Sequence, residues 1–242
     1  MATSPDPQDP HTQCAPTSQG RRPPVPRRPT LLLGAVLCAT LFTLLTWQIA
    51  ADGPLRRLDE RLGRALIDGP LPDGVAELLA DLGNTAVALP VLAAVIAGTA
   101  WRARGSGAYR WWLPPLLAAL AMAAVPALVV PLKAAVDRPG PPGADGTGYY
   151  PSGHTATATV AYGAAVLLLL PHLSRLRRAL PLACVLLNAG VGLGLVVRGY
   201  HWPADVVGSW LLCGVLLQAL VLVRLSALSR STRRSSSRTP GC

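Results

Sequence analysis

Residues that could do chemistry gather in three short stretches of this 242-residue chain, each at the end of a long apolar run. The stretches are PLKAAVDRPGPPG at 131–143, GYYPSGHT at 148–155 and VVRGYHWPADVV at 196–207. Their members of interest are Lys133, Arg138, Ser152, Gly153, His154, Arg198, His201 and Asp205. A polar cluster in or near lipid costs free energy unless something satisfies it, so we expect these groups to hold one another or a ligand.

Together these residue types suit one reaction, the metal-independent transfer of a phosphoryl group. Lysine, arginine and the free amides at a helix N-terminus bind anions, and arginine can form paired hydrogen bonds to phosphate. His201 and Asp205 lie one helical turn apart, so the carboxylate can hold one ring nitrogen while the other attacks. His154 has no carboxylate within four residues on either side, which favours it as the general acid.

Each stretch alone also has an ordinary structural explanation. A lysine at a helix end often extends its amine to the membrane interface, and Ser152 behind Pro151 could simply cap a helix. His201 and Asp205 could form no more than a local hydrogen bond. Chemistry becomes the better interpretation if all three stretches fall on one side of a membrane.

The composition indicates an integral membrane protein, because 51% of the residues are hydrophobic and only 14% are charged. A net charge of +10 could indicate nucleic-acid binding, but the basic residues form no stripe among aromatic residues, so we expect no nucleic-acid partner. The five cysteines show no CxxC spacing and no pairing framework, so we expect neither a zinc site nor disulfides.

Six apolar runs are long enough to cross about 30 Å of hydrocarbon as helices, so the predicted fold is all-α, a bundle of six transmembrane helices. The runs cover about 30–50, 85–101, 111–134, 154–171, 179–197 and 204–223. Of the 22 basic residues, 15 lie in the two tails and in the second and fourth connections. Because basic residues are enriched in cytoplasmic loops, both termini are predicted to be cytoplasmic and the three stretches to lie at the outer face of the plasma membrane.

The domain organisation follows from these runs. Residues 1–28 and 225–242 are predicted to be disordered basic cytoplasmic tails, and residues 29–224 to be the membrane domain. The first run could instead be a cleaved signal peptide, but its apolar core is longer than usual for one. In the first outer connection, Leu55, Leu58, Leu62 and Leu66 stand at helical spacing, which predicts a short helix lying on the membrane surface.

At these residues the sequence resembles the type 2 phosphatidic acid phosphatase superfamily, whose motifs are Lys-x6-Arg-Pro, Pro-Ser-Gly-His and Ser-Arg-x5-His-x3-Asp. The second motif matches completely at residues 151–154, and the third matches at His201 and Asp205. The resemblance covers roughly residues 55–220. It implies that His201 is the nucleophile, Asp205 orients it and His154 protonates the leaving group, with Lys133, Ser152 and the Gly153 amide on the phosphate and no metal or other cofactor.

Two arginines depart from the family's spacing. Gly140 stands where the first motif expects arginine, and the nearest arginine is Arg138, two residues early. Leu195 stands where the third motif expects arginine, and the nearest is Arg198, three residues late. Because arginine side chains are long, we predict that Arg138 and Arg198 bind phosphate from shifted positions.

The predicted function is hydrolysis of a lipid phosphate or diphosphate through a phosphohistidine, with the lipid bilayer as the other partner. Undecaprenyl diphosphate, phosphatidic acid and phosphatidylglycerol phosphate are the candidate substrates. The high content of arginine, alanine, glycine and proline suggests a bacterial gene. A phosphotransferase of the same family and a non-catalytic lipid-binding or transport protein are alternatives, and the sequence leaves the oligomeric state open.

Overall fold

The computed structural model describes residues 28–67, 69, 71–107 and 110–236, with side chains described as far as Ser226. The described residues form helices and no strands, which confirms the predicted all-α fold. The helices are α1 (Arg28–Ala50), α2 (Pro54–Ile67), α3 (Asp73–Asp81), α4 (Thr85–Gly105), α5 (Leu113–Val136), α6 (Gly153–Leu169), the 3-10 turn η1 (Ser174–Leu176), α7 (Ala179–Val197) and α8 (Pro203–Ser236).

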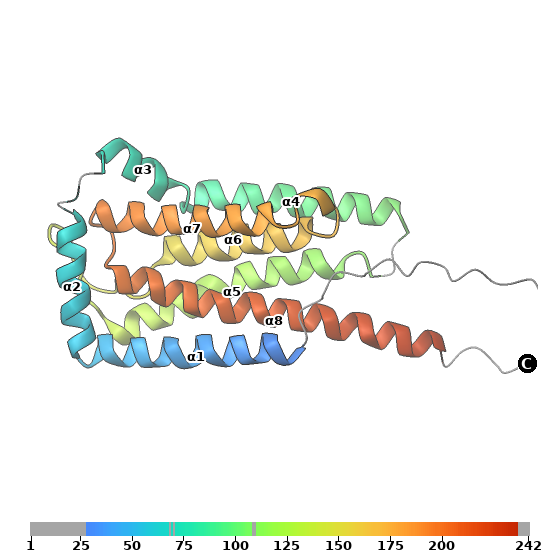
Figure 1. The fold of residues 1–242 in the computed structure, drawn as a ribbon, viewed down its shortest axis with the longest axis horizontal. Helices are drawn as coiled ribbons and strands as arrows, with labels where there is room; N and C mark the ends of the chain where they lie inside the picture. The colour runs from blue at the N-terminus through green and yellow to red at the C-terminus, as the bar shows by residue number, and fades with distance from the viewer. Residues whose placement is uncertain (1–27, 68, 70, 108–109, 237–242) are drawn as a thin grey trace, which may run out of the picture.

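Six long helices run side by side, and α2 and α3 lie across one end of the bundle (Figure 1). Successive long helices alternate in direction. The connections α1 to α4, α5 to α6 and α7 to α8 therefore meet at the end covered by α2. The start of α1 and the end of α8 lie at the opposite end.

Helix α6 forms the core of the bundle and contacts α4, α5, α7 and α8. Close contact is possible because the helix is rich in small residues; at Gly163 an added Cβ would stand 2.6 Å from a Leu217 methyl. Five helices of the described chain, α1, α4, α5, α7 and α8, are long and apolar enough to cross a membrane, whereas α6 has only 17 residues. The predicted fourth span is therefore a shorter helix that four others surround.

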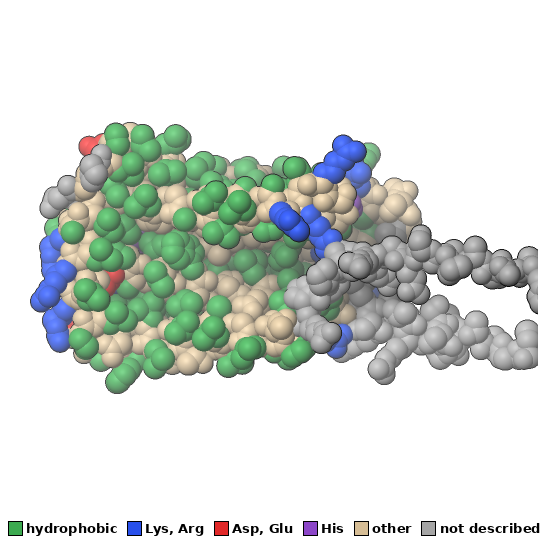
Figure 2. Space-filling model, viewed as in Figure 1, with side chains coloured by type: hydrophobic (Ala, Val, Ile, Leu, Met, Phe, Trp, Pro, Cys, Tyr) green, Lys and Arg blue, Asp and Glu red, His purple; other side chains and the backbone are tan. Residues whose placement is uncertain are grey.

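The flanks of the bundle are apolar where a soluble protein would be polar. Large hydrophobic side chains are exposed along the long helices, among them Leu33, Trp47, Val130 and Leu186. Figure 2 shows hydrophobic side chains over the flank and basic side chains gathered at the two ends. Lipid must cover such a surface, so the chain is a multi-pass membrane protein.

The helix that was predicted to lie on the membrane surface is present as α2, but the face that it buries is not its leucine face. Leu58 and Leu62 are 61% and 50% exposed, while Asp59 and Gly63 are buried against the bundle. An exposed leucine face suits a helix in the membrane interface. The carboxylate on the opposite side becomes important for the site described below.

The C-terminal tail prediction needs correction, because α8 runs to Ser236 and includes the first twelve residues of the segment 225–242 that was predicted to be disordered. The helix continues because no proline or glycine follows Gly214 until Pro240. The remainder of that prediction, residues 237–242, and residues 1–27 of the predicted tail 1–28 lie outside the described residues, while Arg28 begins α1.

Candidate active site

His201 and Asp205 lie where the chain turns from α7 into α8. Gly199, with a φ of +68°, makes the turn possible, and Pro203 begins α8. The Asp205 carboxylate then faces back: its Oδ2 lies 3.2 Å from His201 Nδ1 and accepts the Trp202 amide at 3.0 Å. Asp205 is fully buried and His201 is 7% exposed, so one ring nitrogen is held and Nε2 is left for another partner.

Leu195, which stands where the family motif expects arginine, has a local structural role. Its side chain is buried, and its carbonyl accepts the amides of Tyr200 and His201 at 2.9 and 3.2 Å. These bonds close the end of α7. The position therefore fixes the turn that carries His201, but it supplies no charge to the site.

The second stretch forms the start of α6. Ser152 is fully buried and caps the helix, its Oγ accepting the Thr155 amide at 3.3 Å and the Thr155 hydroxyl at 3.0 Å. The amides of Gly153 and His154, the first two helical residues, have no acceptor within the helix. Ser152, which is predicted to bind phosphate, therefore caps the helix, and Gly153 and His154 beside it face open space.

Lys133 and the loop after α5 close the third side of the site. The Lys133 amine donates to the Gly148 carbonyl at 2.7 Å and points into the same cavity as His154. The ring of Tyr149 meets the ring of His201 edge to face, with 5.8 Å between centroids. No sequence pattern indicates Tyr149, because its position depends on how the glycine- and proline-rich loop folds back.

Arg138 does not face the cavity, which corrects its prediction as a phosphate ligand. It is 1% exposed and bridges two carboxylates, donating from Nη1 to Asp205 Oδ1 and from Nη2 to Asp59 Oδ2, both at 2.6 Å. Asp137 ends α5 in a left-handed conformation, and Arg138 after it does not line the cavity that Lys133 lines. Both guanidinium ends are occupied by carboxylates, so Arg138 organises the site from behind.

Arg198 lies beside the site but is paired with acidic residues. Its Nε donates to Glu77 Oε2 at 2.6 Å, and its Nη1 lies 3.2 Å from Asp73 Oδ1. Hydrogen bonds from Tyr200 and Arg198 hold the pKa of Glu77 below its usual value, and the Glu77 carboxylate raises the pKa of Arg198. Arg198 is therefore charged, and its guanidinium is paired with two carboxylates of α3.

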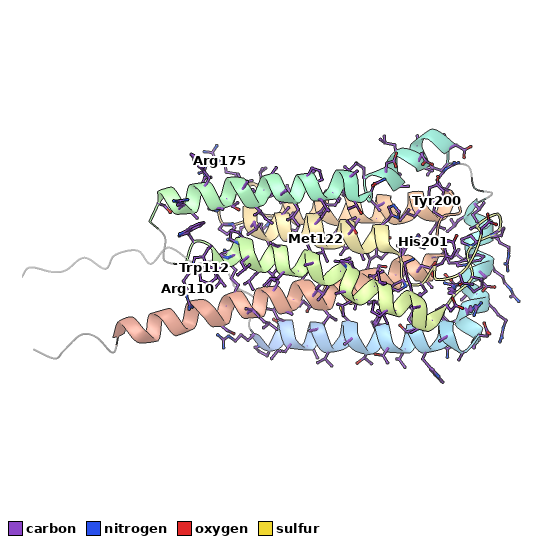
Figure 3. The ribbon with its side chains drawn as sticks, turned by 180° about the vertical axis from the view of Figure 1, so that it is seen from behind. Arg110, Trp112, Met122, Arg175, Tyr200 and His201 are labelled. Atoms are coloured by element: carbon purple, nitrogen blue, oxygen red, sulfur yellow. The ribbon has the colours of Figure 1, made fainter. Side chains whose placement is uncertain are left out.

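Two cavities meet at the catalytic candidates. A groove of about 980 Å³ runs between α4 and α5, lined by apolar residues such as Leu89, Ile96 and Met122, and ends at Lys133, His154 and His201. A second cleft of about 650 Å³ is lined by Glu77, Asp81, Asn84 and Arg198 and reaches the same two histidines. Figure 3 places His201 and Tyr200 at the α2 end, far from Arg175 at the other, with Met122 midway along the bundle.

The arrangement can bind an anion and attack it. Lys133, the α6 amides and Arg198 supply positive charge around a histidine whose second nitrogen is held by a carboxylate. Among the described residues, no group of three His, Cys, Asp or Glu side chains is placed to hold a metal ion. Asp59 and Glu77 contact this machinery and were missed, since each lies about 80 or more residues away from its partner in the sequence.

Comparison with known proteins agrees with this geometry. Residues 114–227 match the family model of the PAP2 superfamily. The fold matches the crystal structure of a transmembrane PAP2 type phosphatidylglycerolphosphate phosphatase from Bacillus subtilis with a TM-score of 0.70 and 23% sequence identity, over 80% of this chain and 96% of that one. No curated protein sequence matches the chain significantly.

Proposed function

From the match of residues 114–227 to the PAP2 superfamily model we propose that the chain is a member of this superfamily. We propose further that it is a membrane phosphatase, which hydrolyses a lipid phosphate or diphosphate through a phosphohistidine on His201. The observation that carries the proposal is the groove between α4 and α5. It joins a long apolar cavity, which suits a lipid chain, directly to the Lys133, His154 and His201 cluster, which suits a phosphate.

In the first step His201 Nε2 attacks the terminal phosphorus, and the bond from this phosphorus to the oxygen of the departing lipid, or of the lipid monophosphate when the substrate is a diphosphate, breaks. Asp205 holds Nδ1 at 3.2 Å and offsets the positive charge that the ring gains. His154 donates a proton to the departing oxygen. Lys133 and the free amides of α6 hold the phosphate oxygens, whose negative charge they match.

In the second step water attacks phosphorus while His154, now unprotonated, accepts its proton. The bond between phosphorus and Nε2 breaks, which releases inorganic phosphate and restores both histidines. No step in this sequence needs a metal ion or another cofactor, so activity should persist when a chelator is present.

The charge pattern supports an orientation for this chemistry. The tails and the connections at the end opposite α2 carry most of the basic residues, which are enriched on the cytoplasmic side. The site therefore faces the extracytoplasmic side of the plasma membrane, and both termini are cytoplasmic.

The proposal is tested by measuring phosphate release in detergent with a chelator present. The substrates are phosphatidic acid, phosphatidylglycerol phosphate, undecaprenyl diphosphate and a water-soluble phosphomonoester without a chain. We expect at least one lipid substrate to be hydrolysed at least about tenfold more efficiently than the soluble ester, because the groove contributes apolar binding energy of more than about 1.4 kcal/mol. Absence of release from every lipid would contradict the proposed function.

A groove-filling variant sharpens that test. Ala119→Trp places an indole in the groove and should raise KM for the preferred lipid about tenfold while leaving the soluble ester unaffected. Ala97→Trp, on an exposed position of α4 outside the groove, is the matched control. Equal effects of the two variants would show that the lipid chain binds elsewhere.

Transfer to an acceptor other than water is a second candidate, because the polar cleft beside His154 and His201 leaves room for one. With labelled lipid phosphate, hydrolysis sends the label to free phosphate and transfer sends it to the acceptor. The same assay therefore separates the two activities.

Arg198 is predicted to bind phosphate from the polar cleft while sharing its charge with Glu77. Arg198→Ala should raise KM about tenfold with little change in kcat, because it removes one charge-assisted contact of about 1.4 kcal/mol. Glu77→Gln should lower KM, since it releases the guanidinium toward the substrate. Arg175→Ala, at the other end of the bundle, is the control and should keep the wild-type KM. An unchanged KM in Arg198→Ala would show that Arg198 does not bind phosphate.

A further inference from the structure

We infer that Asp59, on the surface helix α2, is a positioning residue for the nucleophile, and that it acts through Arg138 on Asp205. The inference rests on the proposed function, since it concerns the same histidine. It assigns a role to a residue outside the matched family region, 114–227.

The three side chains form a buried bridge from α2 to α8. Arg138 lies between the carboxylates of Asp59 and Asp205, at 2.6 Å from each, and all three residues are at most 6% exposed. A buried charge pair is maintained only where its geometry is well satisfied. One guanidinium therefore binds two buried carboxylates. Replacing any of these three side chains changes the hydrogen bonds of the other two.

Asp59 also fixes the backbone that carries the catalytic pair. Its second oxygen, Oδ1, accepts the amide of Ala204 at 2.7 Å, one residue before Asp205. Gly63, one helical turn after Asp59 on α2, lies so close to the Trp202 ring that an added Cβ would stand 2.5 Å from it. Helix α2 is thus packed directly on the turn from His201 to Asp205.

The direction of the effect follows from how arginine binds carboxylates. A guanidinium readily forms two parallel bonds to both oxygens of one carboxylate. Here Asp59 holds Nη2, so Arg138 bonds only Oδ1 of Asp205 and leaves Oδ2 for His201 Nδ1. Without the Asp59 charge, Arg138 is free to take both oxygens of Asp205 and to draw Oδ2 away from the histidine.

The main test is Asp59→Asn, which keeps the side-chain shape and an acceptor for the Ala204 amide but removes the charge. The variant should lower kcat about 10- to 100-fold, because a reacting group misplaced by about 1 Å can lose about 100-fold in rate, and should leave KM within about twofold. A phosphate ligand would instead raise KM. Glu60→Gln, the neighbouring acid on α2 that pairs with Arg56 and not with the site, is the matched control and should keep the wild-type kcat.

A second measurement does not depend on phosphate release. The chain has four histidines, so the ring nitrogens of ¹⁵N-histidine-labelled protein can be assigned, with His201→Ala identifying the His201 signals. Asp59→Asn should shift the Nδ1 signal of His201, and Glu60→Gln should not. An unchanged Nδ1 signal would overturn the inference even if no substrate of the panel were hydrolysed.

Arg138→Lys covers the case in which Asp59→Asn does not fold. The ammonium keeps the buried charge but cannot span both carboxylates as the guanidinium does. This variant should also lower kcat at an unchanged KM and shift the His201 Nδ1 signal. If the wild type releases phosphate and either folded variant keeps both the wild-type kcat and the wild-type Nδ1 signal, the positioning role is wrong while the proposed function stands.

Discussion

Replacing His201 by alanine is expected to lower phosphate release at least about a thousandfold, because the variant lacks the proposed nucleophile. His201 is the imidazole whose Nδ1 is held by a buried carboxylate, and it lines both cavities. Initial rates measured on the preferred lipid substrate, at a concentration well above the wild-type KM, test this directly.

His172→Ala is the matched control, because His172 is exposed at the opposite end of the bundle, between α6 and η1. It should retain the wild-type rate and shows that losing a histidine does not itself inactivate the protein. Trapping phosphoprotein from labelled substrate adds a second readout: the wild type and His172→Ala should give label on protein, and His201→Ala none. A His201→Ala protein that keeps a tenth of the activity would contradict the mechanism.

The bundle could be predicted because each span is encoded locally. Runs of about 20 apolar residues must satisfy their backbone within a helix in lipid, so the positions of α1, α4, α5, α7 and α8 followed from the sequence alone. The range of α6 also agrees with its prediction, since Gly153–Leu169 lies within two residues of the predicted run 154–171 at each end. The helical continuation of α8 to Ser236 differs from the prediction, because the polar composition of residues 225–236 is also typical of a disordered tail.

Whether the partner of a site residue could be predicted depends on how far away that partner lies in the sequence. His201 and Asp205 are four residues apart, so helical geometry sufficed to predict that they meet. Arg138 bonds Asp59, which lies 79 residues away, so no local pattern indicates this partner. Asp59 and Glu77 have no motif around them, and only the packing of α2 and α3 over the turn into α8 reveals their partners.

For Ser152 the sequence allows two roles and cannot choose between them. The sequence offered two roles for it, a cap and a phosphate ligand, and both need a hydroxyl at a helix N-terminus. Complete burial and the bonds with Thr155 show the cap, and the phosphate contact of Ser152 stays a prediction. The cap role could be predicted because it depends only on the residues that follow Ser152 in the sequence.

Replacing His154 by alanine is expected to lower activity by an amount that depends on the leaving group. Protonating a lipid alkoxide is worth about 10²- to 10⁴-fold in rate, so hydrolysis of an alkyl phosphate should slow by that factor. A lipid-tailed nitrophenyl phosphate needs no proton to depart, so its first turnover should stay within about tenfold of the wild type. His154 is exposed to both cavities, where a departing oxygen can reach it.

The same variant separates the two steps of the mechanism. Because His154 is also proposed to activate the water that releases phosphate, His154→Ala should give a burst of nitrophenol close to one equivalent, followed by slow turnover. Rapid mixing measures the burst, and His201→Ala, which cannot form the phosphohistidine, should show none. Equal slowing of the first turnover for alkyl and nitrophenyl substrates would assign His154 to binding, because a general acid must matter less when the leaving group needs no proton.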